Sequence, residues 1–315
     1  MAGERLAYRL RRPGRAAVAA KPDPMKPPSF DYEAPTELAQ AVALLAANEF
    51  DAKLLAGGQS LMPLLNMRLT RPGLLIDLAR IPGLDTIKDE RGGLSIGAMA
   101  RQREVELSPL VRDRHPLLRA ALLHVAHPQN RNQGTIGGSL AHADPAAELP
   151  ALAVALDAEL EATGPDGKRT IAAADFFVTY LTTSLAGSEI LTTVRYPALP
   201  PRSGWSFVEV ARRHGDFALT GAIAVLVLAP GGKIGEARLV LFAVDSKPRR
   251  ASAAEALLVG EPPSAALFER AGVAASEAIE EPLSDVHATA EFRKSLAATL
   301  TRRALAEAAE RAKAA

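Results

Sequence analysis

Two glycine-rich segments constrain this chain more than any other feature of its sequence. The first is Ala56-Gly57-Gly58-Gln59-Ser60, and the second is Thr135-Ile136-Gly137-Gly138-Ser139. Consecutive glycines let a backbone turn sharply, leave its N–H groups accessible and allow close approach, because no Cβ is in the way. A tight turn explains either segment alone about as well as a binding loop does. Two such segments in one chain favour a ligand with an extended anionic part, such as a dinucleotide pyrophosphate.

Apolar patterning around the first segment predicts a small βαβ unit. Residues 53–56 and 74–78 are typical of strands, and residues 60–69 of a helix capped by Ser60 with Pro63 in its first turn. An earlier helix is expected over residues 36–47, with Thr36 as its N-cap. A helix that begins directly after a glycine turn presents unpaired N–H groups and its positive dipole end, which favours phosphate. Neither glycine segment matches a Walker A motif or the GxGxxG fingerprint.

The remaining patterns predict an α+β protein with two domains. Hairpins are expected over residues 84–98 and 158–171, and a strand over residues 190–196 runs into Pro197, Pro200 and Pro201, which we take as the domain boundary. The first domain then spans residues 25–200. The second spans residues 201–315, with a three-stranded sheet (206–211, 222–228, 237–244) followed by helices over 252–259, 264–279 and 291–313.

Composition excludes several classes of function. The formal net charge is +1 and aromatic residues make up 4% of the 315 residues, which argues against a nucleic-acid-binding surface. The chain contains no cysteine, so it has no disulfide, thiolate nucleophile, iron–sulfur ligand or cysteinyl-flavin link of its own. No apolar run reaches the length of a membrane span. The expected location is the cytoplasm, with association at the inner face of the membrane as an alternative.

The first 24 residues differ from the rest of the chain. They hold six basic residues against two acidic ones, and they lack apolar periodicity. A targeting signal would need a longer apolar stretch after the basic part. We expect either a disordered basic extension or a start assigned too early, with Met25 as the favoured beginning.

Three stretches carry a resemblance to a known family. They are KLLAGGQSLMPLLNMRL (53–69), PQNRNQGTIGGSLAHADPAAELP (128–150) and RRHGDFAL (212–219). In this order and spacing they strongly resemble the medium, FAD-binding subunit of the molybdenum hydroxylases, which include xanthine dehydrogenase and aerobic carbon monoxide dehydrogenase. The resemblance covers the chain from Met25 onward. It implies a two-part FAD-binding domain of the vanillyl-alcohol-oxidase-like (PCMH-type) architecture, followed by a small α+β domain.

The resemblance also implies which residues hold FAD. Both glycine segments would cradle the pyrophosphate and ribityl chain, and Glu148 would hydrogen-bond the ribityl or phosphate region. Asp216 and Phe217 lie where relatives place a side chain over the isoalloxazine; Phe stacks as Tyr does but has no hydroxyl group. Leu191 is expected near the ring or the adenine, and Lys53 near the phosphates, although a core leucine and a solvated lysine are the ordinary interpretations. No catalytic residue and no metal ligand is assigned; His124, His127 and His142 are interpreted as ordinary surface or core histidines.

One departure bears on the cofactor linkage. Many relatives have His where this chain has Gln59, and flavoproteins of the broader fold attach FAD through histidine, so we expect non-covalent FAD. The implied function is electron transfer from 2Fe-2S clusters on a small partner subunit to an external acceptor. The molybdopterin cofactor would lie on a large partner subunit, and the complex would be a dimer of heterotrimers. A stand-alone FAD-dependent oxidoreductase and a non-catalytic scaffold that has lost FAD are the alternatives.

Overall fold

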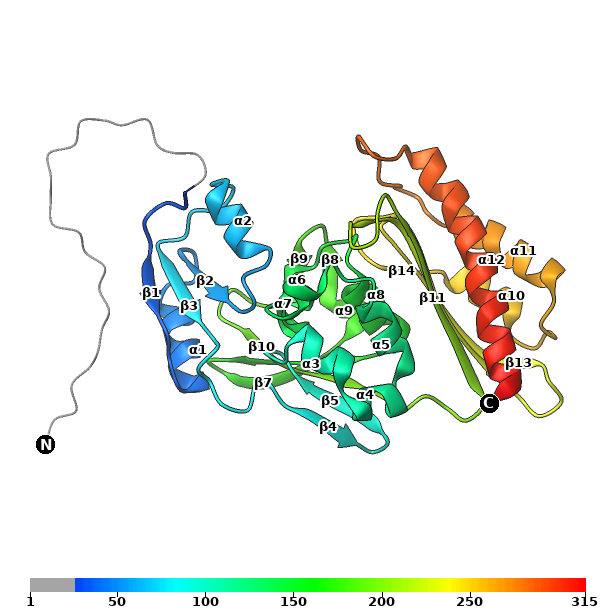
Figure 1. The fold of residues 1–315 in the computed structure, drawn as a ribbon, viewed down its shortest axis with the longest axis horizontal. Helices are drawn as coiled ribbons and strands as arrows, with labels where there is room; N and C mark the ends of the chain where they lie inside the picture. Colours follow the sequence, from blue (N-terminus) through cyan, green and yellow to red (C-terminus); the bar gives the residue numbers. More distant parts are fainter. Residues whose placement is uncertain (1–25) are drawn as a thin grey trace, which may run out of the picture.

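The structure, a computed structural model, describes residues 26–315. The prediction made for residues 1–24 therefore lies outside the described residues. Figure 1 shows three parts in chain order: a small N-terminal lobe, a central lobe, and a C-terminal domain in which one long helix covers a sheet. The two lobes correspond to the expected two-part domain, and the predicted mixture of helix and sheet is confirmed.

The N-terminal lobe is a three-stranded parallel sheet in the order β1-β3-β2. The predicted βαβ unit is present, because β2 and β3 pair in parallel and α2 connects them. The first helix begins at Leu38, with Glu37 rather than Thr36 at the N-cap, which is one residue later than predicted, and no side chain caps it. The elements of this lobe are β1 (Asp31–Glu33), α1 (Leu38–Ala47), β2 (Ala52–Leu55), α2 (Leu61–Asn66) and β3 (Leu74–Asp77).

The central lobe is a five-stranded antiparallel sheet covered by short helices, with strand order β4-β5-β10-β6-β7. Both predicted hairpins are present, as β4–β5 and β6–β7. Its strands are β4 (Ile87–Glu90), β5 (Gly93–Gly97), β6 (Glu159–Gly164), β7 (Gly167–Ala172) and β10 (Ile190–Tyr196), with a separate β8–β9 pair (Phe177–Thr179, Thr182–Thr183). Its helices are α3 (Gln102–Leu107), α4 (Pro109–Arg114), α5 (Pro116–Leu122), α6 (Pro128–Arg131), α7 (Ile136–His142), α8 (Glu148–Ala155) and α9 (Ala173–Phe176).

The C-terminal domain is a sheet in the order β11-β12-β13-β14, packed against α10, α11 and α12. The described sheet has four strands rather than the predicted three, because β14 is two arginines long and too short to give an alternating pattern. The elements are β11 (Ser203–Ala211), β12 (Ala218–Leu228), β13 (Ile234–Phe242), β14 (Arg249–Arg250), α10 (Ser252–Leu258), α11 (Ala265–Glu277) and α12 (Ala290–Ala314).

Strand β12 is buried on both faces, and this joins the C-terminal domain to the central lobe. Ile223 and Val225 belong to the same core as the central lobe, whereas Ala222, Ala224 and Leu226 pack in the core beneath the three helices. Alternate residues of a strand point to opposite faces, so one strand serves both cores. The C-terminal domain therefore holds β11 and its turn in a fixed position relative to the central lobe.

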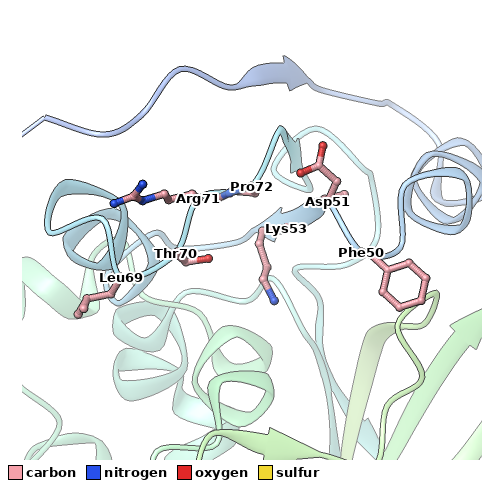
Figure 2. Close-up of a pocket in the computed structure, with 8 residues that line it drawn as sticks. Phe50, Asp51, Lys53, Leu69, Thr70, Arg71 and Pro72 are labelled. Atoms are coloured by element: carbon pink, nitrogen blue, oxygen red, sulfur yellow. The ribbon is translucent and has the colours of Figure 1, made fainter. Parts of the chain in front are cut away.

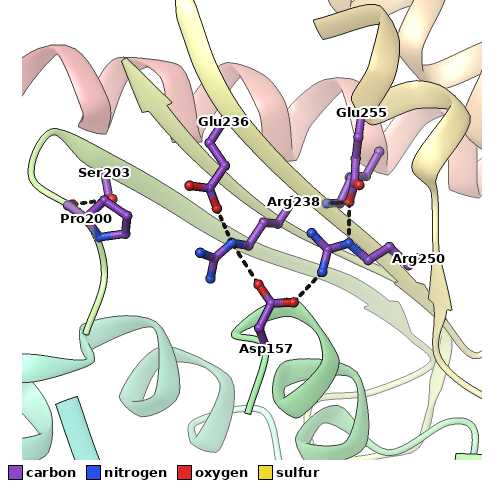
Figure 3. Close-up of polar contacts among 8 residues, drawn as sticks. Asp157, Pro200, Ser203, Glu236, Arg238, Arg250 and Glu255 are labelled. Carbon is purple, nitrogen blue, oxygen red and sulfur yellow. Dashed lines mark hydrogen bonds and ion pairs between the residues drawn. The ribbon is translucent and has the colours of Figure 1, made fainter. Parts of the chain in front are cut away.

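An ionic network at the edge of this contact adds to the attachment, as Figure 3 shows. Asp157, two residues after the end of α8, accepts from Arg238 of β13 at 3.2 Å and from Arg250 of β14. Arg238 also pairs with Glu236 at 2.6 Å, and Arg250 with Glu255 at 2.8 Å. Each arginine therefore forms two ion pairs, one with Asp157 of the central lobe and one with a carboxylate of its own domain.

We expect Asp157→Asn to lower the free energy of unfolding by about 1 kcal/mol at low salt, and by less at high salt, because its side chain is 47% exposed. Asn tolerates the left-handed backbone at this position, where φ is 47°. Urea unfolding at two salt concentrations measures the change. Asp166→Asn, an exposed acid in the β6–β7 turn, is the control, and equal effects from both variants would contradict the assignment.

Candidate FAD site

The two glycine segments lie against each other, one at the end of β2 and the other at the start of α7. We call residues 56–60 the first glycine loop and residues 135–139 the second glycine loop. A Cβ placed on Gly57 would lie 2.4 Å from the carbonyl oxygen of Gln133 and 2.8 Å from the Cα of Gly134. A Cβ placed on Gly138 would lie 3.3 Å from the Cβ of Ala56. The N-terminal and central lobes thus meet at a contact that requires glycine.

The first glycine loop presents backbone donors that no described residue uses. The structure records no hydrogen bond from the N–H groups of residues 57–60 to any acceptor within residues 26–315. Gly58 has a φ of 70°, in the left-handed region that favours glycine. Gln59 Nε2 donates to the Gly57 carbonyl at 3.0 Å, and the Ser60 side chain at the N-cap of α2 accepts no capping bond. Free N–H groups in a turn of this kind suit anionic oxygens.

The second glycine loop differs from expectation, because the N–H groups of residues 136–139 already have acceptors. Ile136 and Gly137 donate to the carbonyls of Ala100 and Ala98 at 3.0 and 2.8 Å. Gly138 donates to Thr135 Oγ1 at 3.0 Å, the N-cap bond of α7, and Ser139 N–H donates to the Thr135 carbonyl. Gly137 also packs tightly, since a Cβ there would lie 2.4 Å from that of Ala98. The second loop therefore suits a ligand that approaches its backbone closely, whereas most of its N–H groups are already used.

Helix α6 supports both loops, and sequence reasoning did not single it out. Asn130 Nδ2 donates to Gln59 Oε1 at 3.3 Å, which ties α6 to the first loop. The Gln133 carbonyl, which faces Gly57, accepts from Arg101. These residues lie inside the motif 128–150, but nothing in the sequence showed that they contact the first loop.

A buried ion pair fixes α6 to α3. Arg131 Nε lies 2.8 Å from Glu106 Oε2, and the two side chains are 4% and 5% exposed. Arg131 also donates to the carbonyls of Val125 and Ala126, at 2.8 and 3.1 Å. Glu106 pairs in addition with Arg103. This pair therefore holds the segment that leads into the second glycine loop.

Glu148 begins α8 and is buried, at 6% exposure, at the end of the segment that follows α7. Burial, followed by the negative charge of Glu209, raises the pKa of Glu148 to about 8. Glu209 reaches this region from β11, and its Oε1 lies 3.0 Å from His124 Nδ1. Its other oxygen is buried and has no partner among the described residues. Sequence reasoning missed Glu209, which is 61 residues from Glu148 in the chain.

Asp216 and Phe217 lie in the turn between β11 and β12, which reaches the central lobe at the start of α6. A Cβ on Gly215 would lie 2.7 Å from His127 Cε1, and His127 is the N-cap of α6. Asp216 is exposed and the Phe217 side chain is 65% exposed, so its ring face is free to stack on a planar ligand. Because α6 also carries Asn130, this turn and the first glycine loop contact the same helix.

The two remaining predicted residues lie on strands, Leu191 on β10 and Lys53 on β2. Leu191 is buried in the core on β10, beside Thr192, whose carbonyl accepts from the N–H of Ala98. Lys53 lines a separate hollow of about 330 Å³ formed by residues 50–53 and 69–72. Figure 2 shows its side chain pointing away from Asp51 and Arg71. The structure records no ion pair for Lys53 within residues 26–315.

The residues present fit a dinucleotide with an anionic bridge and a planar ring. The first glycine loop offers N–H groups that no acceptor within residues 26–315 uses and contacts the second glycine loop, and Phe217 offers an exposed aromatic ring on the β11–β12 turn. Among the described residues, no group of three or more His, Asp and Glu side chains could hold a metal ion. In the same range, no helix is both long enough and apolar enough to cross a bilayer.

Comparison with known proteins identifies the class. Residues 28–199 match the model of the FAD-binding domain in molybdopterin dehydrogenase, and residues 205–308 match the carbon monoxide dehydrogenase flavoprotein C-terminal domain. The chain is 41% identical to the alpha subunit of the 6-hydroxypseudooxynicotine dehydrogenase complex of Paenarthrobacter nicotinovorans, over 92% of this chain and 97% of that subunit.

Two solved structures have the same fold as this chain. Carbon monoxide dehydrogenase from Hydrogenophaga pseudoflava superposes with a TM-score of 0.89 at 39% identity, covering 91% of this chain and 99% of the other. Quinoline 2-oxidoreductase from Pseudomonas putida 86 superposes with a TM-score of 0.87 at 40% identity, covering 91% and 99%.

The chain belongs to the family of FAD-binding subunits of the molybdopterin-dependent dehydrogenases. The resemblance drawn from the sequence, the two-part FAD-binding fold, the oxidoreductase class and FAD as the cofactor are all confirmed. Relatives are named as subunits or chains of larger enzymes, so this is a subunit type that works with partners.

Proposed function

We propose that this chain is the electron-exit subunit of a molybdenum hydroxylase. Its FAD would receive electrons from 2Fe-2S clusters on a small partner subunit and pass them to an external acceptor. The observation that carries the proposal is the contact between two glycine loops, one of which presents four N–H groups that no acceptor in the described part of the chain uses, in a chain of this family. FAD supplies the redox chemistry, and the protein supplies binding, orientation and electrostatics.

The proposed binding residues divide into three groups by what they would contact. The first glycine loop would bind the pyrophosphate through its free donors, and the second would lie against the same part of the cofactor. Phe217, with Asp216 beside it, would cover one face of the isoalloxazine. Glu148 would hydrogen-bond the ribityl or phosphate region, Leu191 would lie near the ring or adenine, and Lys53 would approach the phosphates from its hollow.

The FAD would be held without a covalent bond, because Gln59 occupies the position at which many relatives carry histidine. An amide side chain does not form the linkage that an imidazole nitrogen can form to a flavin. In this structure the Gln59 side chain also bonds to the Gly57 carbonyl within the loop and to Asn130 on α6. We expect mild acid to release the flavin into solution, and flavin that stays with the precipitated protein would contradict this expectation.

The partners would be a small subunit with two 2Fe-2S clusters and a large molybdopterin subunit, assembled as a dimer of heterotrimers in the cytoplasm. The chain supplies no cysteine for clusters, so the metal chemistry must come from other chains. Relatives act on substrates as different as carbon monoxide and quinoline, which supports placing substrate selectivity on the large subunit.

Purification of the native complex through a tag on this chain tests the proposal. We expect iron and molybdenum to co-elute with FAD in constant ratios, and substrate to reduce the flavin only when both partner subunits are present. Flavin reduction by an organic substrate with this chain alone would overturn the electron-exit assignment and favour a stand-alone oxidoreductase.

A further inference from the structure

The side chains of Gln59 and Asn130 form a hydrogen-bonded bridge between the N-terminal lobe and the central lobe. Gln59 lies in the first glycine loop, and its Nε2 donates to the Gly57 carbonyl at 3.0 Å. Asn130 lies in α6, and its Nδ2 donates to Gln59 Oε1 at 3.3 Å. Because a carbonyl oxygen can only accept, the Gly57 carbonyl fixes the direction of the Gln59 amide group, which leaves Oε1 as the acceptor for Asn130.

The bridge holds a loop whose carbonyls are engaged and whose N–H groups are not. The carbonyls of residues 58 and 60 accept from N–H groups at the start of α2, at 3.0 and 3.2 Å. The Gly57 carbonyl accepts from the Gln59 side chain. No acceptor within residues 26–315 takes the N–H groups of residues 57–60. Successive N–H groups left in this way form a concave site that suits anionic oxygens.

Asn130 is a firm support for this bridge, because the residues around it are fixed. Its backbone carbonyl accepts from the N–H of Gly134 at 2.7 Å, in the segment that contacts the first glycine loop. The next residue, Arg131, is held by the buried ion pair with Glu106 and by two backbone carbonyls. Gln59, in contrast, is exposed, so without Asn130 its side chain would exchange the Gly57 carbonyl for water more readily.

We propose that Asn130 is a positioning residue for the cofactor: through Gln59 it holds the first glycine loop in the conformation that presents its N–H groups to the pyrophosphate. This inference rests on the proposed function, which places that loop against the pyrophosphate. A loop that is ordered before its ligand arrives loses less conformational entropy on binding. The bridge lowers this cost because it connects the loop to a fixed helix.

A double-mutant cycle on the full chain tests the inference, with the dissociation constant of FAD measured by the fluorescence of unbound flavin. Asn130→Leu keeps the shape of the side chain and removes its donor, and Gln59→Met keeps the length of the side chain and removes its amide group. We expect each variant to weaken FAD binding about fivefold, the effect of one lost hydrogen bond. The double variant should bind no more weakly than the weaker single variant, because both substitutions break the same bridge.

Amide hydrogen exchange of the FAD-saturated chain provides a second readout. FAD should slow exchange in the peptide that spans residues 56–60, and this protection should fall in Asn130→Leu and in Gln59→Met. Gln129→Leu is the matched control, because Gln129 is an exposed amide residue of α6 whose side chain bonds to no other residue within residues 26–315. This control should leave both the FAD affinity and the exchange protection unchanged.

Normal FAD affinity in either single variant would overturn the inference, and so would losses that add up in the double variant. If Asn130→Leu does not fold, as judged by circular dichroism, Asn130→Ala replaces it in the cycle with the same expectation. Unchanged protection of residues 56–60 in the variants would overturn this inference alone. FAD binding that does not slow exchange in these residues would also refute the assignment of the pyrophosphate to this loop, which belongs to the proposed function.

Discussion

Replacing Gly57 with valine is expected to weaken FAD binding by about 100-fold or more, equivalent to about 2.7 kcal/mol. The new Cβ would lie 2.4 Å from the Gln133 carbonyl oxygen and 2.8 Å from the Gly134 Cα, both of which are backbone atoms that a rotamer change cannot move. The two glycine loops would separate, and the donors of residues 57–60 would be displaced. FAD titration of the purified variant, followed by flavin fluorescence, measures the loss.

The control for this variant is Gly235→Val on β13. A Cβ at Gly235 would come no closer than 3.3 Å to any atom, the Ala229 Cβ, and its backbone neighbours, Ala229 N and the Val227 carbonyl oxygen, lie at 3.6 Å. We expect near-normal FAD affinity in this variant, and an intact circular dichroism spectrum in both. Normal FAD affinity in Gly57→Val would show that the contact between the loops is not needed for binding.

Replacing Arg131 with methionine is expected to lower the free energy of unfolding by about 3 kcal/mol, because removing one partner of a buried ion pair leaves the other uncompensated. Glu106 would keep only Arg103, whose side chain is 35% exposed, and the carbonyls of Val125 and Ala126 would lose their donor. Urea unfolding of the FAD-free chain measures this change. FAD affinity should also fall, since α6 supports both glycine loops.

The double variant Arg131→Met with Glu106→Met separates the effect of the uncompensated Glu106 charge from the effect of the lost donors to the carbonyls of residues 125 and 126. Replacing both partners of a buried pair by apolar residues removes the uncompensated charge, so much of the lost stability should return. FAD affinity should return less, because the donors to residues 125 and 126 are still missing. If Arg131→Met were as stable as the double variant, the buried Glu106 charge would not need Arg131 as its partner, and the prediction would be wrong.

Local patterns were enough to predict most elements of this fold. The βαβ unit around the first glycine loop and both hairpins follow from short-range signals, namely glycine turns between apolar runs. The same signals did not show β14, which is two residues long, or the true start of α1. Short elements and helix ends depend on tertiary pairing, which a local pattern does not contain.

The site was predicted less completely, because it is formed by segments that are far apart in the sequence. The sequence predicts free N–H groups in the second glycine loop, but the backbone carbonyls of Ala98 and Ala100, just after β5, accept hydrogen bonds from two of these groups. That pairing becomes visible only when β5 and α7 are placed together. Glu209 gave no signal in the sequence, since an acid near the end of a strand normally faces solvent. The close approach of Gln133 to Gly57 likewise depends on how the two lobes meet.

The most direct test of the account is the visible spectrum of the purified full chain, followed by mild acid treatment and identification of any released flavin. We predict a flavin spectrum and close to one FAD per chain in the soluble fraction after acid. A folded, colourless protein that takes up no added FAD, even with both partner subunits present, would contradict the account and favour a scaffold that has lost its cofactor.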